Sequence, residues 1–175
     1  MATLTLLFHY GTFQVLWQQP ELMQAGPQIE DGPNSLHVDE PSVPALLRKL
    51  STRGWPGRGV LVHYSDPFLM RSEPLREVRT WPGPRLLACG DLHHGPHPIE
   101  TLSSYLCNEP HDAVLLTFNP ALLEKVSHSL NVPTRSFPPS FFRYPIAIPS
   151  TQRRLELLHV GSLGPNHQRR RELVT

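Results

Sequence analysis

The sequence has 175 residues, of which 39% are hydrophobic, so one folded domain is expected more than two. A formal net charge of +1 argues against nucleic acid as a partner, because proteins that bind it carry a basic excess. The apolar runs are far shorter than a membrane span, and the first residues lack the basic segment and cleavage site of a signal peptide. The two cysteines, Cys89 and Cys107, favour a reduced pair and a cytoplasmic location.

The chain contains 20 prolines, more than twice the average usage, but they form no low-complexity block. Pro41, Pro67, Pro98 and Pro120 each stand at the start of a helical pattern, where proline suits the first turn. This distribution indicates a well-punctuated globular domain.

Apolar segments rich in β-branched residues predict strands along the whole chain. Most are continuous runs without alternation, which is typical of a parallel sheet covered on both faces. Residues 10–35 show no clear periodicity, and the stretch 13–17 is open between helix and strand. The predicted strands are 4–8, 36–38, 59–64, 85–89, 112–118, 134–137 and 155–160.

Helical patterns separate these strands, with capping residues and first-turn prolines at their starts. Strands that alternate with helices predict a Rossmann-like α/β fold: a parallel sheet with helices on both faces and right-handed crossovers. We expect residues 1–150 to form this domain, with a proline-rich linker at its end, and residues 151–175 to begin a second lobe. The predicted helices are 41–52, 67–79, 98–106 and 120–130.

The first candidate site is the loop Cys89-Gly-Asp-Leu-His-His-Gly-Pro-His97, which follows a predicted strand. Ligands bind at the carboxyl ends of strands in open α/β sheets, so Asp91 and His93 are candidate catalytic residues, with Asp91 as a general base. A metal site built from Asp91, His93, His94 and His97 is an alternative. The further motifs of metallophosphoesterases, which share a Gly-Asp-x-His string, are missing. In a third interpretation Asp91 only caps a turn.

The second candidate site is the turn Gly161-Ser-Leu-Gly164 between a predicted strand and a basic helix. Glycines allow close backbone approach to a diphosphate, and arginine binds phosphate oxygens in a bidentate manner. This pattern predicts a binding site for a phosphate or diphosphate group, formed by Gly161, Ser162, Gly164, His167 and Arg169. An ordinary strand-to-helix turn is the alternative.

The segment Val160-Gly-Ser-Leu-Gly-Pro-Asn-His-Gln-Arg-Arg170, together with Gly90-Asp-Leu-His93, resembles GT-B glycosyltransferases related to the spore-maturation protein CgeB. The resemblance implies that residues 1–150 are the acceptor-side lobe and that 160–170 open the donor-binding lobe. It implies transfer of a sugar from a nucleotide-sugar donor, which is a substrate, to an unknown acceptor, with no cofactor and no obligatory metal. We expect little transferase activity from these 175 residues, because most of the donor lobe would be missing.

Two alternatives from other classes stay open. The chain could be a non-catalytic Rossmann-like binding module, in which an exposed C-terminal element predicts a homodimer. It could instead be a metal-dependent hydrolase that uses the Asp91 loop. Among the scattered histidines, His9 follows a first strand, and the segment His63-Tyr-Ser-Asp66 ends another, so both could approach the same cleft.

Overall fold

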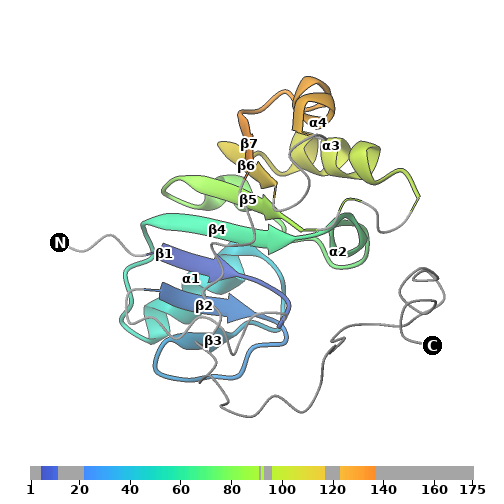
Figure 1. Cartoon of the computed structure of the whole chain (residues 1–175). Coiled ribbons are helices and arrows are strands. Elements are labelled where there is room, and N and C mark those ends of the chain that lie inside the picture. The colour runs from blue at the N-terminus through green and yellow to red at the C-terminus, as the bar shows by residue number, and fades with distance from the viewer. Residues whose placement is uncertain (1–4, 12–21, 91, 93–95, 117–122, 137–175) are drawn as a thin grey trace, which may run out of the picture. The chain divides into compact units, whose positions relative to one another are not determined.

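The computed structural model describes residues 5–11, 22–90, 92, 96–116 and 123–136 (Figure 1). The chain divides into two compact units, Met1–Tyr144 and Pro145–Thr175. All described residues belong to the first unit.

The described residues form a parallel sheet of seven strands in the order β3-β2-β1-β4-β5-β6-β7 (Figure 1). Every neighbouring pair is parallel. This arrangement confirms the predicted Rossmann-like α/β fold. The strands are β1 (Thr5–Phe8), β2 (Leu22–Gly26), β3 (Ser35–His37), β4 (Val60–Ser65), β5 (Arg85–Cys89), β6 (Ala113–Leu116) and β7 (Thr134–Ser136).

Helices connect most of the strands, and local signals set their ends. The Ser42 hydroxyl accepts a hydrogen bond from the Ala45 N–H at 3.3 Å, which caps the first helix. The second helix is shorter than predicted because Pro74 disfavours the helical conformation at the preceding residue, Glu73. The described helices are α1 (Val43–Thr52), α2 (Pro67–Ser72), α3 (Pro98–Asn108), α4 (Leu123–Ser129) and the 3₁₀ turn η1 (Val78–Thr80).

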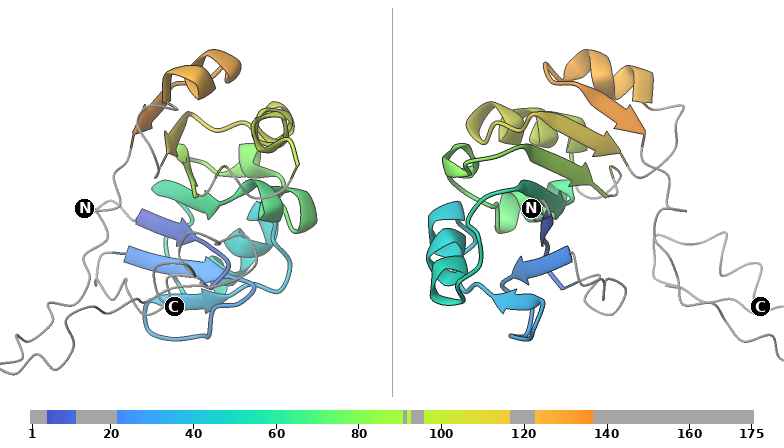
Figure 2. Two further views of the ribbon diagram at one scale, coloured as in Figure 1. Left: turned by 45° about the vertical axis from the view of Figure 1, so that its right-hand side comes forward. Right: turned by 90° about the vertical axis from the view of Figure 1, so that its left-hand side faces the viewer.

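The described α-helices lie together on one face of the sheet (Figure 2), so within the described residues the predicted helical cover of the second face is not seen. The connections through α1, α2, α3 and α4 all step in the same direction across the sheet, so right-handed crossovers place them on the same side. Of the two connections that step the other way, β1 to β2 runs through residues 12–21, outside the described residues, and β2 to β3 contains no helix.

Two apolar clusters fill the space between this face and the helices. One packs α1 against β1, β2, β3 and β4, with Leu46 and Leu50 fully buried. The other packs α3 and α4 against β5 and β6, with Leu102 and Val126 fully buried. Burial of such side chains supplies the main driving force for folding, at about 1.5–3 kcal/mol for each large apolar side chain.

The sheet reverses its strand order between β1 and β4, which are neighbours paired from Thr5↔Val60 to Phe8↔His63. The chain moves from β1 to one edge through β2 and β3, and from β4 to the other edge through β5, β6 and β7. In open α/β sheets, ligands bind outside the carboxyl ends of the strands at this switch point. The fold therefore directs attention to the residues that follow β1 and β4.

Strand β2 was not predicted from the sequence, because Gln24 and Gly26 interrupt its apolar character. The structure explains both residues. The Gln24 side chain is buried but hydrogen-bonded to His9, and Gly26 lies against the backbone of His9. None of the helices in the described ranges is long and apolar enough to cross a membrane.

Candidate functional site

The candidate site is the carboxyl edge of the sheet around the switch point. His9, Tyr10 and Gly11 follow β1 directly, Asp66 follows β4, and Gly90 follows β5. The side chains of β4 alternate here: His63 and Ser65 are buried on the helix-covered face, and Tyr64 is half-buried on the opposite face. Polar groups from separate segments thus meet at one edge.

His9 is held in one orientation and one tautomer. Its Nδ1 accepts a hydrogen bond from the Gly11 N–H at 3.2 Å, so the ring proton is on Nε2. The Nε2–H then donates to the Gln24 side-chain oxygen at 3.0 Å. Burial lowers the pKa of His9, and the hydrogen bond to Gln24 opposes this shift. A neutral His9 therefore fixes the start of the loop after β1.

Two glycines allow the strands to approach closely at this edge. A Cβ atom on Gly26 would lie 1.8 Å from the carbonyl oxygen of His9, so no side chain fits there. A Cβ on Gly90 would lie 2.6 Å from the Tyr64 hydroxyl. The Gly90 N–H donates to the Ser65 carbonyl at 2.9 Å. The Tyr64 hydroxyl is therefore packed against the first residue of the Asp91 loop.

The helix that follows β4 begins at the same edge. The Asp66 carboxylate accepts a hydrogen bond from the Leu69 N–H at 3.0 Å and so caps α2. Phe68, in the first turn of α2, is 61% exposed and is the one large exposed hydrophobic side chain among the described residues. Figure 1 shows α2, whose first turn contains Phe68, beyond the carboxyl end of β4.

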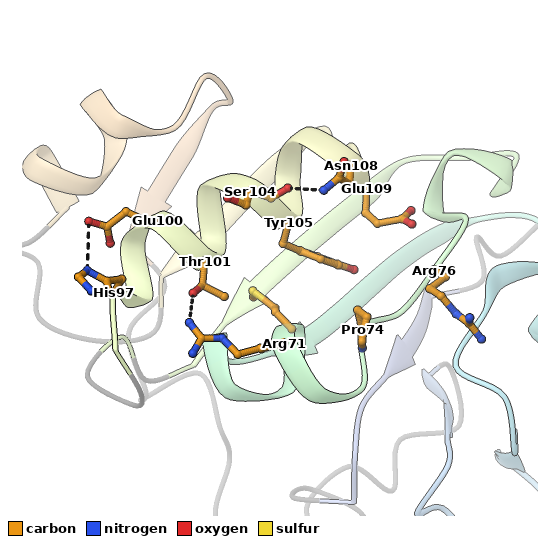
Figure 3. Close-up of a pocket in the computed structure, with 11 residues that line it drawn as sticks. Arg71, Pro74, Arg76, His97, Glu100, Thr101, Ser104, Tyr105, Asn108 and Glu109 are labelled. Carbon is orange, nitrogen blue, oxygen red and sulfur yellow. Dashed lines mark hydrogen bonds and ion pairs between the residues drawn. The ribbon is translucent and has the colours of Figure 1, made fainter.

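A groove of about 470 Å³ lies between α2 and α3 (Figure 3). Its lining mixes cations such as Arg71 with carboxylates such as Glu100. The Arg71 guanidinium donates to the Pro96 carbonyl at 3.0 Å and to the Thr101 hydroxyl at 2.8 Å, and so fastens the start of α3 to α2. Tyr105 contributes to the lining from α3. The groove is on the helix-covered side of the sheet, where α2 packs against α3.

The structure describes only some of the predicted site residues. Asp91, His93 and His94 lie outside the described residues, as do Gly161, Ser162, Gly164, His167 and Arg169. His97 is described: it is exposed, has a left-handed backbone (φ 53°), and its Nδ1 is 3.8 Å from the Glu100 carboxylate.

The side chain of His63 is fully buried and lies 3.2 Å from the Tyr105 hydroxyl of α3, so it is not exposed at the carboxyl edge. Within the described part of the chain, no group of three potential metal ligands comes together. Cys89 is buried and Cys107 is exposed.

The residues Gln24, Tyr64 and Phe68 at this edge were not singled out individually as binding residues from the sequence. A polar residue inside a short apolar run (Gln24) and an aromatic residue directly after a helix-initiating Asp-Pro (Phe68) are the signals that could have indicated two of them. Comparison of the chain with protein-family models, with curated proteins and with solved structures gives no match.

Proposed function

We propose that the described domain is the acceptor-side lobe of a GT-B glycosyltransferase similar to the CgeB group. The switch point between β1 and β4, with polar side chains at its carboxyl edge, is the observation that carries this proposal. The proposed reaction moves a sugar from a nucleotide-diphosphate donor to an acceptor bound at this edge.

The loop after β1 supports an acceptor rather than a dinucleotide at this edge. A dinucleotide fold carries a Gly-x-G-x-x-Gly fingerprint there, so that the backbone can approach the pyrophosphate. Here the sequence after β1 is His9-Tyr-Gly-Thr-Phe-Gln14, with Gly11 as its single glycine. We therefore assign the donor diphosphate to the Gly161–Gly164 turn and its Arg169, and the acceptor to the described edge.

The edge offers the chemistry that a hydroxylated acceptor requires. The Tyr64 hydroxyl and the Asp66 carboxylate supply a donor and an acceptor of hydrogen bonds, and the exposed Phe68 ring supplies an apolar surface. Asp91 follows Gly90 in the sequence, and we assign it the role of general base or acceptor anchor, with His93 beside it. In a transferase, a base within reach of the attacking hydroxyl accelerates the reaction by about 10²–10⁴-fold.

Calorimetric titration of the protein with UDP- and GDP-sugars tests the donor assignment. We expect one nucleotide-sugar class to bind, and Arg169→Ala to weaken that binding about tenfold or more, because a charge-assisted bond to phosphate is lost. Arg79→Ala, which removes an exposed arginine of η1, is the matched control and should bind as the wild type does. Absence of nucleotide-sugar binding, or equal binding by both variants, would contradict the proposal.

A further inference from the structure

A buried cluster of aromatic rings lies between the sheet and the helices α2 and α3. We call it the ring cluster and define it as Phe8, Tyr10, His63, Tyr105 and His111. His63 is at its centre: its ring centroid is 5.7 Å from that of His111, 5.8 Å from Tyr105 and 5.9 Å from Phe8. The two imidazoles are stacked, with an angle of 24° between their planes. Two titratable side chains thus share one buried site.

Hydrogen bonds determine which nitrogen of each histidine carries the proton. The Nδ1 of His111 is 2.8 Å from the Glu109 carbonyl oxygen, which only accepts, so Nδ1 is protonated. The Tyr105 hydroxyl donates to the Leu75 carbonyl at 2.8 Å, so its oxygen accepts from the Nδ1–H of His63 at 3.2 Å. Both histidines therefore present an unprotonated Nε2.

Both Nε2 atoms are buried and have no hydrogen-bond partner in the structure. A proton added to either atom creates a charged N–H donor with no acceptor, and the second imidazole stacks beside it. A buried charge without a partner is strongly disfavoured. The geometry alone therefore opposes protonation of the pair while the cluster stays packed.

The groups around the pair do not offset this cost. Burial lowers the pKa of His111, and the hydrogen bond to the Glu109 carbonyl opposes this shift only in part. Arg85 lowers this pKa further and Asp112 raises it, and Arg85 and Asp112 are paired with each other. The Glu109 carboxylate is engaged by the N–H groups of Glu77 and Val78. Neutral tyrosines complete the surroundings, with the Tyr10 hydroxyl donating to the Glu73 carbonyl. The titratable or charged groups facing the pair are Tyr10, Glu73, Arg85, Tyr105, Glu109 and Asp112.

We propose that the His63–His111 pair is an acid-sensitive lock that holds α3 and the segment 75–78 on the sheet. In its neutral form the pair packs against Tyr105, whose hydroxyl binds Leu75, and next to Glu109, whose carboxylate binds the backbone at 77–78. Protonation of either imidazole favours a state in which the ring cluster has opened. Because Tyr105 and Glu109 also line the groove between α2 and α3, this opening changes the groove.

The sign and the pH range follow from the pKa values. Burial lowers the pKa of His63 well below 6.5, with a further contribution from His111, and burial lowers the pKa of His111 to about 4. The opened state, with ordinary histidines, therefore binds more protons below about pH 6.5. The packed state is fully favoured above that pH and loses stability as the pH falls toward the lowered values. The opening or unfolding constant rises by up to about tenfold per pH unit for each histidine.

Urea unfolding between pH 7.5 and 4.5 tests the lock. His111→Asn keeps a donor for the Glu109 carbonyl but cannot be protonated. It should make the pH dependence shallower: the logarithm of the unfolding constant should rise by about one less per pH unit of acidification than in the wild type. For His63→Asn/His111→Asn this rise should be smaller by about two per pH unit. His97→Asn, at an exposed histidine, is the matched control and should keep the wild-type slope. His9, whose pKa is also lowered, contributes equally to every variant. An unchanged slope in His111→Asn would overturn the proposal.

Two measurements on the wild-type protein complete the test. In the NMR spectrum, the imidazole signals of His63 and His111 should not titrate between pH 8 and 5. A pKa near 6.5 assigned to either histidine would overturn the proposal, and this test holds even if the double variant fails to fold. Hydrogen exchange, corrected for its intrinsic pH dependence, should show protection at Glu77 and Val78 falling on acidification before that of β1 and β2. A uniform loss of protection across the domain would contradict a lock on α3.

Discussion

The two ends of the sheet are built in opposite ways. At the amino end, Arg85 and Asp112 form a two-pronged ion pair, with contacts of 2.7 and 3.2 Å, and the Asp112 carboxylate also accepts the Arg85 backbone N–H at 2.8 Å. The Trp81 ring nitrogen donates to the Gly59 carbonyl at 2.9 Å beside them. At the carboxyl end, by contrast, no described arginine–carboxylate pair joins β1, β4 and β5, and Phe68 is exposed.

This difference suits the amino end of the sheet to stabilising the fold and the carboxyl end to the proposed binding of a ligand. The charges of Arg85 and Asp112 are satisfied by each other and by the backbone, so that end of the sheet is closed and joins β5 to the start of β6. The carboxyl end uses small contacts, such as those of His9 and Asp66, to fix loops while leaving an aromatic surface in solvent. We therefore expect substitutions at the amino end to change stability, and those at exposed positions of the carboxyl end to change binding.

The largest expected effect tests the close packing of the carboxyl end. In Gly26→Ala the new Cβ would lie 1.8 Å from the His9 carbonyl oxygen, and backbone cannot move aside without loss of the β1–β2 ladder. We expect a loss of about 3 kcal/mol or more in the free energy of unfolding, measured by urea denaturation. Gly54→Ala is the control: nothing lies within 4 Å of its Cβ, and only its left-handed φ of +67° opposes the change, at a cost of about 1–2 kcal/mol. Equal losses in the two variants would contradict the clash.

A smaller effect is expected at the amino end from Asp112→Asn. The Arg85 side chain is 22% exposed and that of Asp112 is 45% exposed, so solvent screens the pair and the loss should be about 0.5–1 kcal/mol at pH 7. The hydrogen bond from Arg85 lowers the pKa of Asp112, so its contribution is present above pH 4 and disappears as the pH falls through the lowered pKa. The difference between variant and wild type should therefore vanish in acid.

Glu40→Gln provides the matched control for that experiment. It breaks the Arg76–Glu40 pair, whose side chains are each 55% exposed, and should change the stability by less than about 0.5 kcal/mol. If Glu40→Gln lowers the free energy of unfolding as much as Asp112→Asn does, the two-pronged geometry of the Arg85–Asp112 pair adds no stability beyond that of an ordinary surface ion pair.

The smallest effect on stability is expected from Phe68→Ala at the carboxyl end. The side chain is 61% exposed, so the stability should stay within about 0.5 kcal/mol of the wild type. Binding of a carbohydrate acceptor, measured by NMR titration, should weaken, because the apolar face of a sugar ring loses its surface. Unchanged binding by a normally folded variant would remove Phe68 from the proposed acceptor site.

The sequence predicted those elements in which local signals agree. Strand β5 and the start of α3 match the expectation, because a continuous apolar run ends at Cys89 and Pro98 opens a helical pattern. Strand β2 was missed because Gln24 is polar, yet in the structure its side chain is buried and its oxygen accepts a hydrogen bond from His9, which follows another strand. The hydrophobic periodicity of a sequence does not reveal such a contact between two strands.

The site was predictable only in its location. The rule that ligands bind at the carboxyl ends of strands indicated the segments after β1, β4 and β5, and the structure brings His9, Asp66 and Gly90 to that edge. The orientation of His63 toward α3 was not predictable, because the strand boundary alone does not decide which of two adjacent side chains faces the helices. Asp91 and the Gly161–Gly164 turn lie outside the described residues, and their roles stay predictions.

The order of the strands also determines how the domain can assemble in time. Leu61 pairs with Arg85 and Leu86 with Ala113, each across a single helical crossover, so β4, β5 and β6 can pair as they leave the ribosome. Strand β1 can pair with β4 only after the chain up to Val60 and beyond has been synthesised. Until that contact forms, β1 has an open hydrogen-bonding edge and a larger loop to close, which is slow and exposes the young chain to aggregation. The β1–β4 junction, where the proposed ligand binds, therefore joins the two neighbouring strands that lie furthest apart in the sequence, and its formation closes the longest loop of the sheet.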